Sequence, residues 1–217
     1  MRLLGHYLSP FTRRVAVSLH ALGIPFVLEE LSVMREPERV RPYNPLLRIP
    51  TMVLDDGEAL IESDAMLDEI DQMAGPARAL VPPSGSQRRR VMQIMSFALA
   101  SMDKQQWAFY ERRFRPAEKV HQPWIDHNEA QSLGGLRHLE AVAARATGWL
   151  AGTPAMTQAD ITTAVIVTFL IEVRPDLKDV LPNLCAFAER CEALPAFRAA
   201  AMPASAPGQP GVWMPRS

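Results

Sequence analysis

The sequence is poor in cysteine, and this limits the chemistry to be expected of it. Only two of the 217 residues are cysteines, Cys185 and Cys191. Their separation by six positions in a helical pattern fits neither a CxxC redox pair nor a zinc ligand set. The histidines also lack the spacing of metal ligands. We therefore expect two core thiols in a reduced setting, and no metal.

Net charge and long apolar runs are lacking as well. The 23 Lys and Arg against 24 Asp and Glu give a net charge of -1, so no global basic field is available to hold nucleic acid or an anionic membrane. The basic cluster Arg88-Arg89-Arg90 is expected to be a solvated helix turn or a hinge. The longest apolar stretch, 161–171, is too short to span a bilayer, and no apolar signal region precedes Pro10. We expect a cytoplasmic protein with neither membrane nor nucleic acid as a partner.

Apolar periodicity, in contrast, runs through most of the chain. With 48% hydrophobic residues, the chain is long enough for one large domain or two small ones. In the first part, short strands alternate with helices in the order β-α-β-(loop and helix)-β-β-α. The expected elements are a strand at 2–7, a helix from Ser9-Pro10 to a stop at Gly23, a strand at 25–31, a hairpin of 51–54 and 59–61 about Asp55-Asp56-Gly57, and a helix at 65–73.

A proline-rich stretch separates this part from the rest. Residues 75–86 contain Pro76, Pro82 and Pro83 and cannot continue a helix or a sheet. Beyond them, helical spacing recurs at 91–102, 133–150, 160–173 and 182–194, with no convincing strand. We expect an α+β protein with a first domain at 1–77, a linker at 78–87, an all-helical domain at 88–202 and a Pro/Gly-rich tail at 203–217, which wraps the surface or stays mobile.

Three loop ends carry residues suited to holding a small peptide. Ser9 starts one helix, Glu62-Ser63 starts another, and Ile49-Pro50 leads into a strand. An X-Pro bond at a strand start is a place where a cis peptide exposes the preceding backbone to an extended ligand. Together these features predict a site for a small zwitterionic thiol peptide.

In their order and spacing, these motifs resemble those of the cytosolic glutathione transferase superfamily over nearly the whole chain. The matching segments are SPFTRRV at 9–15, like the active-site turn of its serine-type classes; Asn44-Pro45 through Ile49-Pro50, like the loop before its cis-proline; Glu62-Ser63, like its glutamyl-binding pair; Thr157 to Asp160, like the capping box of its central helix; and Pro182, Leu184, Arg190 and Pro195, like its terminal helix. Leu47 departs from the pattern, since relatives often carry Gly there, and this bears on how the loop at 46–49 presents Arg48.

The resemblance implies a thioredoxin-like first domain, a homodimer and a cytoplasmic role in detoxification. It also implies that reduced glutathione is the co-substrate, and that its sulfur attacks a small, hydrophobic electrophile. The alternatives are a non-catalytic binding or regulatory protein that kept the fold, or a glutathione-dependent peroxidase, isomerase or dehalogenase. Reduction through a mixed disulfide is disfavoured, because the resembling reductase classes place a Cys at position 9.

Ser9 is the candidate catalytic residue. Its hydroxyl is suited to donate a hydrogen bond to the glutathione sulfur while the helix N-terminus stabilises the thiolate, with Thr12 as a substitute donor. Ser followed by Pro is also an ordinary way to begin a helix. Both roles are compatible.

The other candidate ligands of glutathione follow from the resemblance. With a cis bond at Pro50, the backbone of Ile49 would pair with the cysteinyl part, Ser63 would meet the γ-glutamyl carboxylate and Glu62 its ammonium. In the alternative, Ser63 is the N-cap of a helix that starts at Asp64, and Glu62 is a solvated strand-end acid. Phe11 belongs to the site, and Arg35 or, by preference, Arg48 would hold the glycyl carboxylate.

A stripe on the first long helix is the candidate pocket for the second substrate. Its members lie about a turn apart and are Met102, Gln106, Trp107 and Tyr110. Such stripes are more often core. A Gln, a Trp and a Tyr cost more to bury than aliphatic residues, however, and this favours a pocket.

Overall fold

The computed structural model describes residues 1–203 and divides them into two compact units. The first unit contains residues 1–88 together with 190–203, and the second contains residues 89–189. The segment 190–202, which the sequence analysis placed with the helical region, thus groups with the first unit. The expected C-terminal tail lies, from residue 204 on, outside the described residues.

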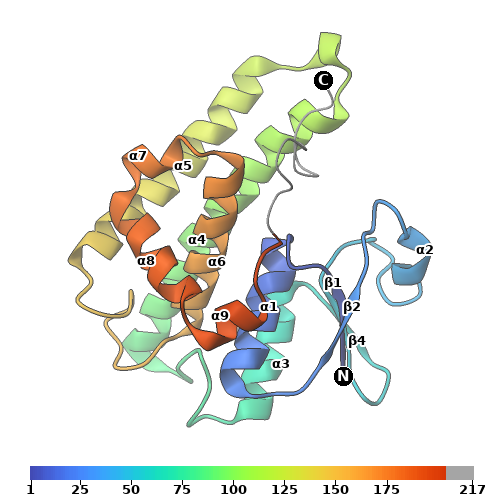
Figure 1. Cartoon of the computed structure of the whole chain (residues 1–217), viewed down its shortest axis with the longest axis vertical. Coiled ribbons are helices and arrows are strands. Elements are labelled where there is room, and N and C mark those ends of the chain that lie inside the picture. The colour runs from blue at the N-terminus through green and yellow to red at the C-terminus, as the bar shows by residue number, and fades with distance from the viewer. Residues whose placement is uncertain (204–217) are drawn as a thin grey trace. The chain divides into compact units, whose positions relative to one another are not determined.

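The first unit is a four-stranded sheet with helices on both faces (Figure 1). Its elements are β1 (Arg2–Gly5), α1 (Pro10–Leu22), β2 (Val27–Glu30), α2 (Pro37–Val40), β3 (Thr51–Val53), β4 (Ala59–Ile61), α3 (Ser63–Ala74) and α9 (Pro195–Ala199). The strand order is β2-β1-β3-β4, with β2 parallel to β1 and the other pairs antiparallel. This thioredoxin-like arrangement confirms the predicted fold class.

Helix α1 begins and ends where its sequence predicts. The Ser9 hydroxyl oxygen accepts a hydrogen bond from the Thr12 backbone N–H at 3.4 Å, and Pro10 occupies the first turn, where its missing N–H costs nothing. Gly23 ends the helix with a φ of 66°, a left-handed conformation that glycine adopts without steric cost.

The sheet separates two apolar layers. Leu4 and Val53 form one cluster with Leu31 and with Val40 of α2. Because side chains alternate along a strand, the fully buried Leu3 and Met52 face the opposite layer, which α1 and α3 cover.

Arg13 explains why the segment 190–203 groups with the first unit. Its side chain, only 1% exposed, donates to both carboxylate oxygens of Glu192 at 2.7 and 2.5 Å and to the carbonyl oxygen of Ala200 at 2.8 Å. The guanidinium also lies over the ring of Phe197, 6.0 Å from its centroid. A buried charge must be paired, so Arg13 ties this segment, and with it α9, to α1.

The second unit is helical. It contains most of α4 (Gly85–Phe114), a 3-10 turn (Ala117–Lys119), α5 (Gln122–Arg145), α6 (Gln158–Val173), α7 (Leu177–Val180) and most of α8 (Pro182–Glu192). The helix expected at 133–150 instead runs over 122–145. It begins earlier because Pro123 is tolerated in a first turn, and it ends at Ala146, which has extended backbone.

The predicted capping box before α6 is present. The carboxylate of Asp160 accepts hydrogen bonds from the backbone N–H and the hydroxyl of Thr157, both at 2.8 Å, and from the backbone N–H of Leu150 at 2.8 Å. Burial raises the pKa of Asp160, and these hydrogen bonds oppose the shift. The box therefore anchors the preceding loop as well as the helix start.

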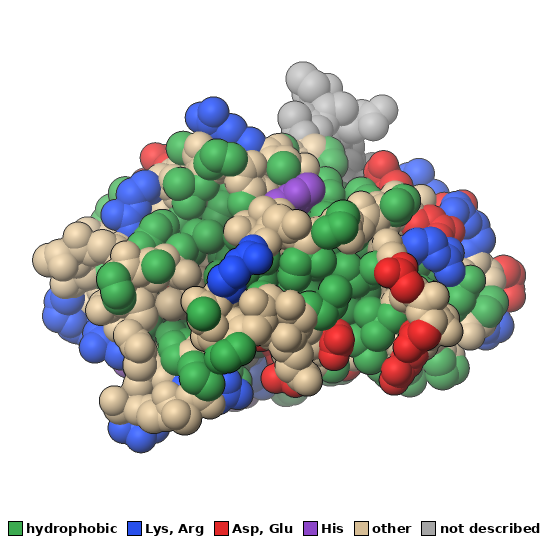
Figure 2. All heavy atoms as spheres, turned by 90° about the horizontal axis from the view of Figure 1, so that it is seen from below, with side chains coloured by type: hydrophobic (Ala, Val, Ile, Leu, Met, Phe, Trp, Pro, Cys, Tyr) green, Lys and Arg blue, Asp and Glu red, His purple; other side chains and the backbone are tan. Residues whose placement is uncertain are grey.

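Within residues 1–203, no helix is both long enough and apolar enough to cross a membrane. Figure 2 shows Lys, Arg, Asp and Glu side chains scattered among hydrophobic ones on the face in view.

Candidate functional site

The strand register brings the three candidate loop ends to one edge of the sheet. Leu4 near the end of β1 pairs with Thr51 at the start of β3, and Thr51 pairs with Ile61 at the end of β4. The chain therefore leaves β1 towards Ser9, enters β3 from Pro50 and leaves β4 towards Glu62 at the same edge. The parallel partner of Gly5 is Glu30, so the loop that contains Arg35 starts there too.

Ser9 caps α1 at this edge and is 6% exposed. Its backbone N–H donates to the carbonyl oxygen of His6 at 3.0 Å, which fixes the turn that enters the helix. The positive end of the α1 dipole lies beside its hydroxyl. This is the environment that stabilises an anion such as a thiolate.

Thr12 does not share this setting. Its side chain is fully buried, and a Cβ on Gly5 of β1 would lie only 2.5 Å from its Oγ1. The hydroxyl thus packs against the strand and has no hydrogen-bond partner among residues 1–203. Full burial against β1 therefore disfavours Thr12 as a substitute donor to a ligand.

The peptide bond between Ile49 and Pro50 is cis, as the resemblance implied. The side-chain amide of Asn44 holds the loop before it, donating to the carbonyl oxygen of Arg48 at 3.0 Å and to Thr51 Oγ1 at 3.1 Å. Leu47, at the position where relatives often carry Gly, has a φ of 52°, a left-handed conformation that costs a non-glycine residue about 1–2 kcal/mol.

Helix α3 begins one residue earlier than expected, so Glu62 and not Ser63 stands at its N-cap. Helix α3 begins at Ser63, and Glu62, with a φ of 65°, occupies the N-cap position without capping through its side chain. Ser63 is therefore not the N-cap of a helix that starts at Asp64. Its hydroxyl oxygen instead accepts a hydrogen bond from Arg14 Nη1 of α1 at 3.0 Å.

Arg14 is a residue of this edge that the sequence analysis did not single out. Its side chain is fully buried, and Nη1 also donates to Asp64 Oδ1 at 2.9 Å. Burial lowers the pKa of Arg14, and Asp64 opposes the shift. The available signal was a pair of arginines followed by the apolar run 15–17 in one helix, but the sequence of a single helix does not tell which partner each arginine meets.

The two candidate cations for the glycyl carboxylate lie in different surroundings. Arg48 donates to Glu62 Oε1 at 2.7 Å. Arg35 is exposed and lies close enough to His6 to affect it: burial lowers the pKa of His6, Glu30 opposes the shift and Arg35 adds to it. Phe11 lies in the first turn of α1 and is partly buried.

The four candidates for the second substrate all lie on α4, in the second unit. Met102 is buried, whereas Trp107 is 51% exposed. The side-chain amide of Gln106 donates to the hydroxyl of Tyr110, and the Tyr110 ring packs edge-on against Phe114 at 5.3 Å between centroids. Gln106 and Tyr110 thus form a polar pair one turn apart beside exposed aromatic rings.

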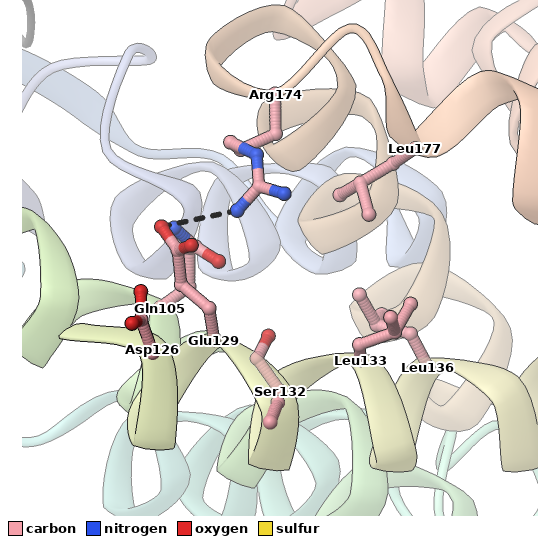
Figure 3. A pocket seen from close by; sticks show the side chains of 9 residues that line it. Gln105, Asp126, Glu129, Ser132, Leu133, Leu136, Arg174 and Leu177 are labelled. Atoms are coloured by element: carbon pink, nitrogen blue, oxygen red, sulfur yellow. Dashed lines mark ion pairs between the residues drawn. The ribbon is translucent and has the colours of Figure 1, made fainter. Parts of the chain in front are cut away.

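The helical unit also contains a cavity of about 270 Å³ that none of these four residues lines. Figure 3 shows its polar side chains Gln105, Asp126 and Glu129 at one end and three leucines at the other. Arg174 Nη1 bridges to Glu129 Oε1 at 3.1 Å. The charges of Arg174 and Glu129 are thus paired with each other within the unit.

Comparison with known proteins places both parts of the chain in one family. Residues 3–78 match the glutathione S-transferase N-terminal domain and residues 92–195 its C-terminal domain. Among curated proteins, the uncharacterized GST-like protein YibF of Escherichia coli is 31% identical over 103 residues, which are 48% of this chain and half of that protein. Glutathione S-transferase U4 of Arabidopsis thaliana is 32% identical over 73 residues, about a third of each chain.

Solved structures match over more of the chain. A glutathione transferase family member from Pseudomonas fluorescens Pf-5 with bound glutathione has a TM-score of 0.82 at 29% identity and covers 94% of this chain and 99% of that one. A glutathione S-transferase from Methylobacillus flagellatus KT, also with glutathione bound, has a TM-score of 0.84 at 25% identity and covers 92% and 98%. The chain therefore belongs to the cytosolic glutathione S-transferase superfamily.

Proposed function

We propose that this protein is a glutathione transferase that binds reduced glutathione at the sheet edge of its first unit and stabilises the thiolate beside Ser9. The observation that carries the proposal is the strand register, because it gathers Ser9, Pro50, Glu62 and Ser63 at one edge. The family match and the relatives with glutathione bound support the choice of ligand.

Each group of the edge fits one part of the tripeptide. Ser63 at the N-terminus of α3 is suited to the γ-glutamyl carboxylate, and the Glu62 carboxylate to the ammonium beside it. The Ile49 backbone is suited to pair with the cysteinyl residue. The sulfur then lies towards Ser9 and the N-terminus of α1.

The chemistry is donation to the sulfur and not general base catalysis. A thiol has a pKa of about 8.5, and lowering it by roughly two units requires on the order of 3 kcal/mol of preferential stabilisation of the thiolate. A charge-assisted hydrogen bond from Ser9 together with a helix N-terminus supplies stabilisation of this size. The thiolate would then attack an electrophilic carbon of a hydrophobic acceptor, displacing a leaving group with its electron pair.

Calorimetry with reduced glutathione tests the binding, and thiolate absorbance followed against pH tests the chemistry. We expect binding at millimolar concentration or below, and ionisation of the bound thiol at lower pH than in free glutathione. Absence of binding, with Glu62 and Ser63 intact, would favour a non-catalytic protein that kept the fold. Binding without a shifted titration would remove the thiolate mechanism and leave glutathione recognition. The homodimer and the cytoplasmic location stay predictions from the resemblance.

A further inference from the structure

Arg14 joins the two helices that end at the proposed glutathione site. Its Nη1 donates to the Ser63 hydroxyl oxygen at 3.0 Å and to Asp64 Oδ1 at 2.9 Å. The Arg14 side chain is fully buried, whereas that of Asp64 is 67% exposed. A buried guanidinium therefore lies directly behind the first residue of α3.

This contact decides what the Ser63 hydroxyl is able to do. A guanidinium has donors only, so the Ser63 oxygen must accept from it, and the hydroxyl proton must point to another acceptor. The N-terminus of α3 favours an anion at that place. The charge of Arg14, little screened because it is buried, adds to the same preference, and the Asp64 carboxylate paired with it offsets part of that charge.

We infer that Arg14 is a positioning residue for the α-carboxylate of the γ-glutamyl group: it orients the Ser63 hydroxyl to donate to that carboxylate and supplies positive charge behind it. The inference rests on the proposed function. It assigns Arg14 no contact with the sulfur and no part in proton transfer.

Arg13 is the matched control that the chain itself offers. It is the preceding residue of the same helix and is also buried, but its donors go to Glu192 and Ala200. A substitution there disturbs a buried guanidinium of α1 without removing the bond to Ser63. General effects of such a substitution on the fold are thereby separated from effects on the carboxylate.

The test is calorimetry with two peptides, glutathione and 4-aminobutyryl-cysteinyl-glycine, which lacks only the α-carboxylate. We expect Arg14→Lys to weaken glutathione binding on the order of tenfold and to leave the affinity for the carboxylate-free peptide nearly unchanged. Arg13→Lys is expected to change both affinities by the same factor. Ser63→Ala should reproduce the selective loss, and Arg14→Lys added to it should remove little more.

Four outcomes would overturn the inference. If Arg14→Lys weakens the binding of both peptides by the same factor, Arg14 has only a structural role. Should that variant not fold, Ser63→Ala still decides: if it binds the two peptides in the wild-type ratio, Arg14 has no route to the carboxylate. A wild-type protein that binds both peptides equally well contradicts the inference but not the proposed function, whereas one that binds neither contradicts both.

Discussion

Arg48 Nη1 lies 2.7 Å from Glu62 Oε1, and both side chains are more than half exposed. The resemblance implies opposite ends of glutathione for these two residues. An extended tripeptide spans about 10 Å, so Arg48 does not hold the glycyl carboxylate as long as it stays paired with Glu62. An exposed ion pair contributes only about 0–1 kcal/mol, and the ligand ammonium could displace Arg48 at little cost.

We therefore expect Arg35, and not Arg48, to serve the glycyl carboxylate. Arg35→Gln should weaken glutathione binding about fivefold but leave γ-glutamylcysteine, which lacks the glycine, unaffected. Arg48→Gln should change both affinities by the same factor, below about fivefold. Calorimetry with the two ligands measures both ratios. A selective loss of glutathione in Arg48→Gln would restore the original assignment.

Ser9→Ala should raise the pKa of the bound glutathione thiol by roughly one to two units, because a charge-assisted hydrogen bond to the thiolate is lost. Thiolate absorbance against pH measures the change. Thr12→Val is the control, since it keeps the shape of a side chain that packs against Gly5. It should leave the titration unchanged and, by removing a hydroxyl without a partner in residues 1–203, should not destabilise the fold. An unchanged titration in Ser9→Ala excludes Ser9 from the mechanism.

Removing Glu192 should destabilise the fold more than removing its partner Arg13. Glu192→Ala leaves the Arg13 charge buried without its carboxylate and should lower the free energy of unfolding by about 3 kcal/mol. Arg13→Met should cost less, since Glu192 is 27% exposed and its carboxylate remains partly solvated. Urea unfolding measures both changes. The control is Glu189→Ala, at an exposed position one turn earlier in α8, which should change the free energy of unfolding by less than about 0.5 kcal/mol. Equal losses of stability in Glu192→Ala and Arg13→Met would contradict the expected asymmetry.

Stability should fall as the pH drops from 7.5 to 5.5. Burial lowers the pKa of His6 and of His20, so the unfolded chain, with a pKa of about 6.5 for each, binds more protons than the folded one. The contribution of these two histidines to stability is fully present above about pH 6.5, the pKa in the unfolded chain, and is lost as the pH falls through their lower pKa in the folded protein. The His20 ring also packs edge-on against Phe26 at 5.1 Å between centroids, so His20→Leu keeps an apolar contact there.

Urea unfolding at the two pH values checks this dependence. The loss between pH 7.5 and 5.5 should be smaller in His20→Leu and in His6→Gln than in the wild type, and smallest in the double variant. A loss of the same size in all four proteins would assign the pH dependence to other groups.

Local signals in the sequence were sufficient for much of the fold. The Ser9-Pro10 start and the Gly23 stop of α1, the hairpin about the turn at 55–57, the capping box at Thr157 and Asp160 and the cis bond at Pro50 agree with expectation. The helix ends, the hairpin and the capping box depend on residues within a few positions of one another, whose conformational preferences do not require the rest of the chain. The cis bond, in contrast, was implied by the family-like motif around Pro50. The order of the motifs further indicated the family.

Only the tertiary structure decided which charged side chains meet. Arg14 reaches Ser63, Arg13 reaches Glu192, and Arg48 reaches Glu62, across 49, 179 and 14 positions of the chain. An arginine side chain is long and flexible, so its sequence position does not determine its partner. Its partner is the acceptor that the packed helices and strands bring within reach, and burial then requires that the contact be made.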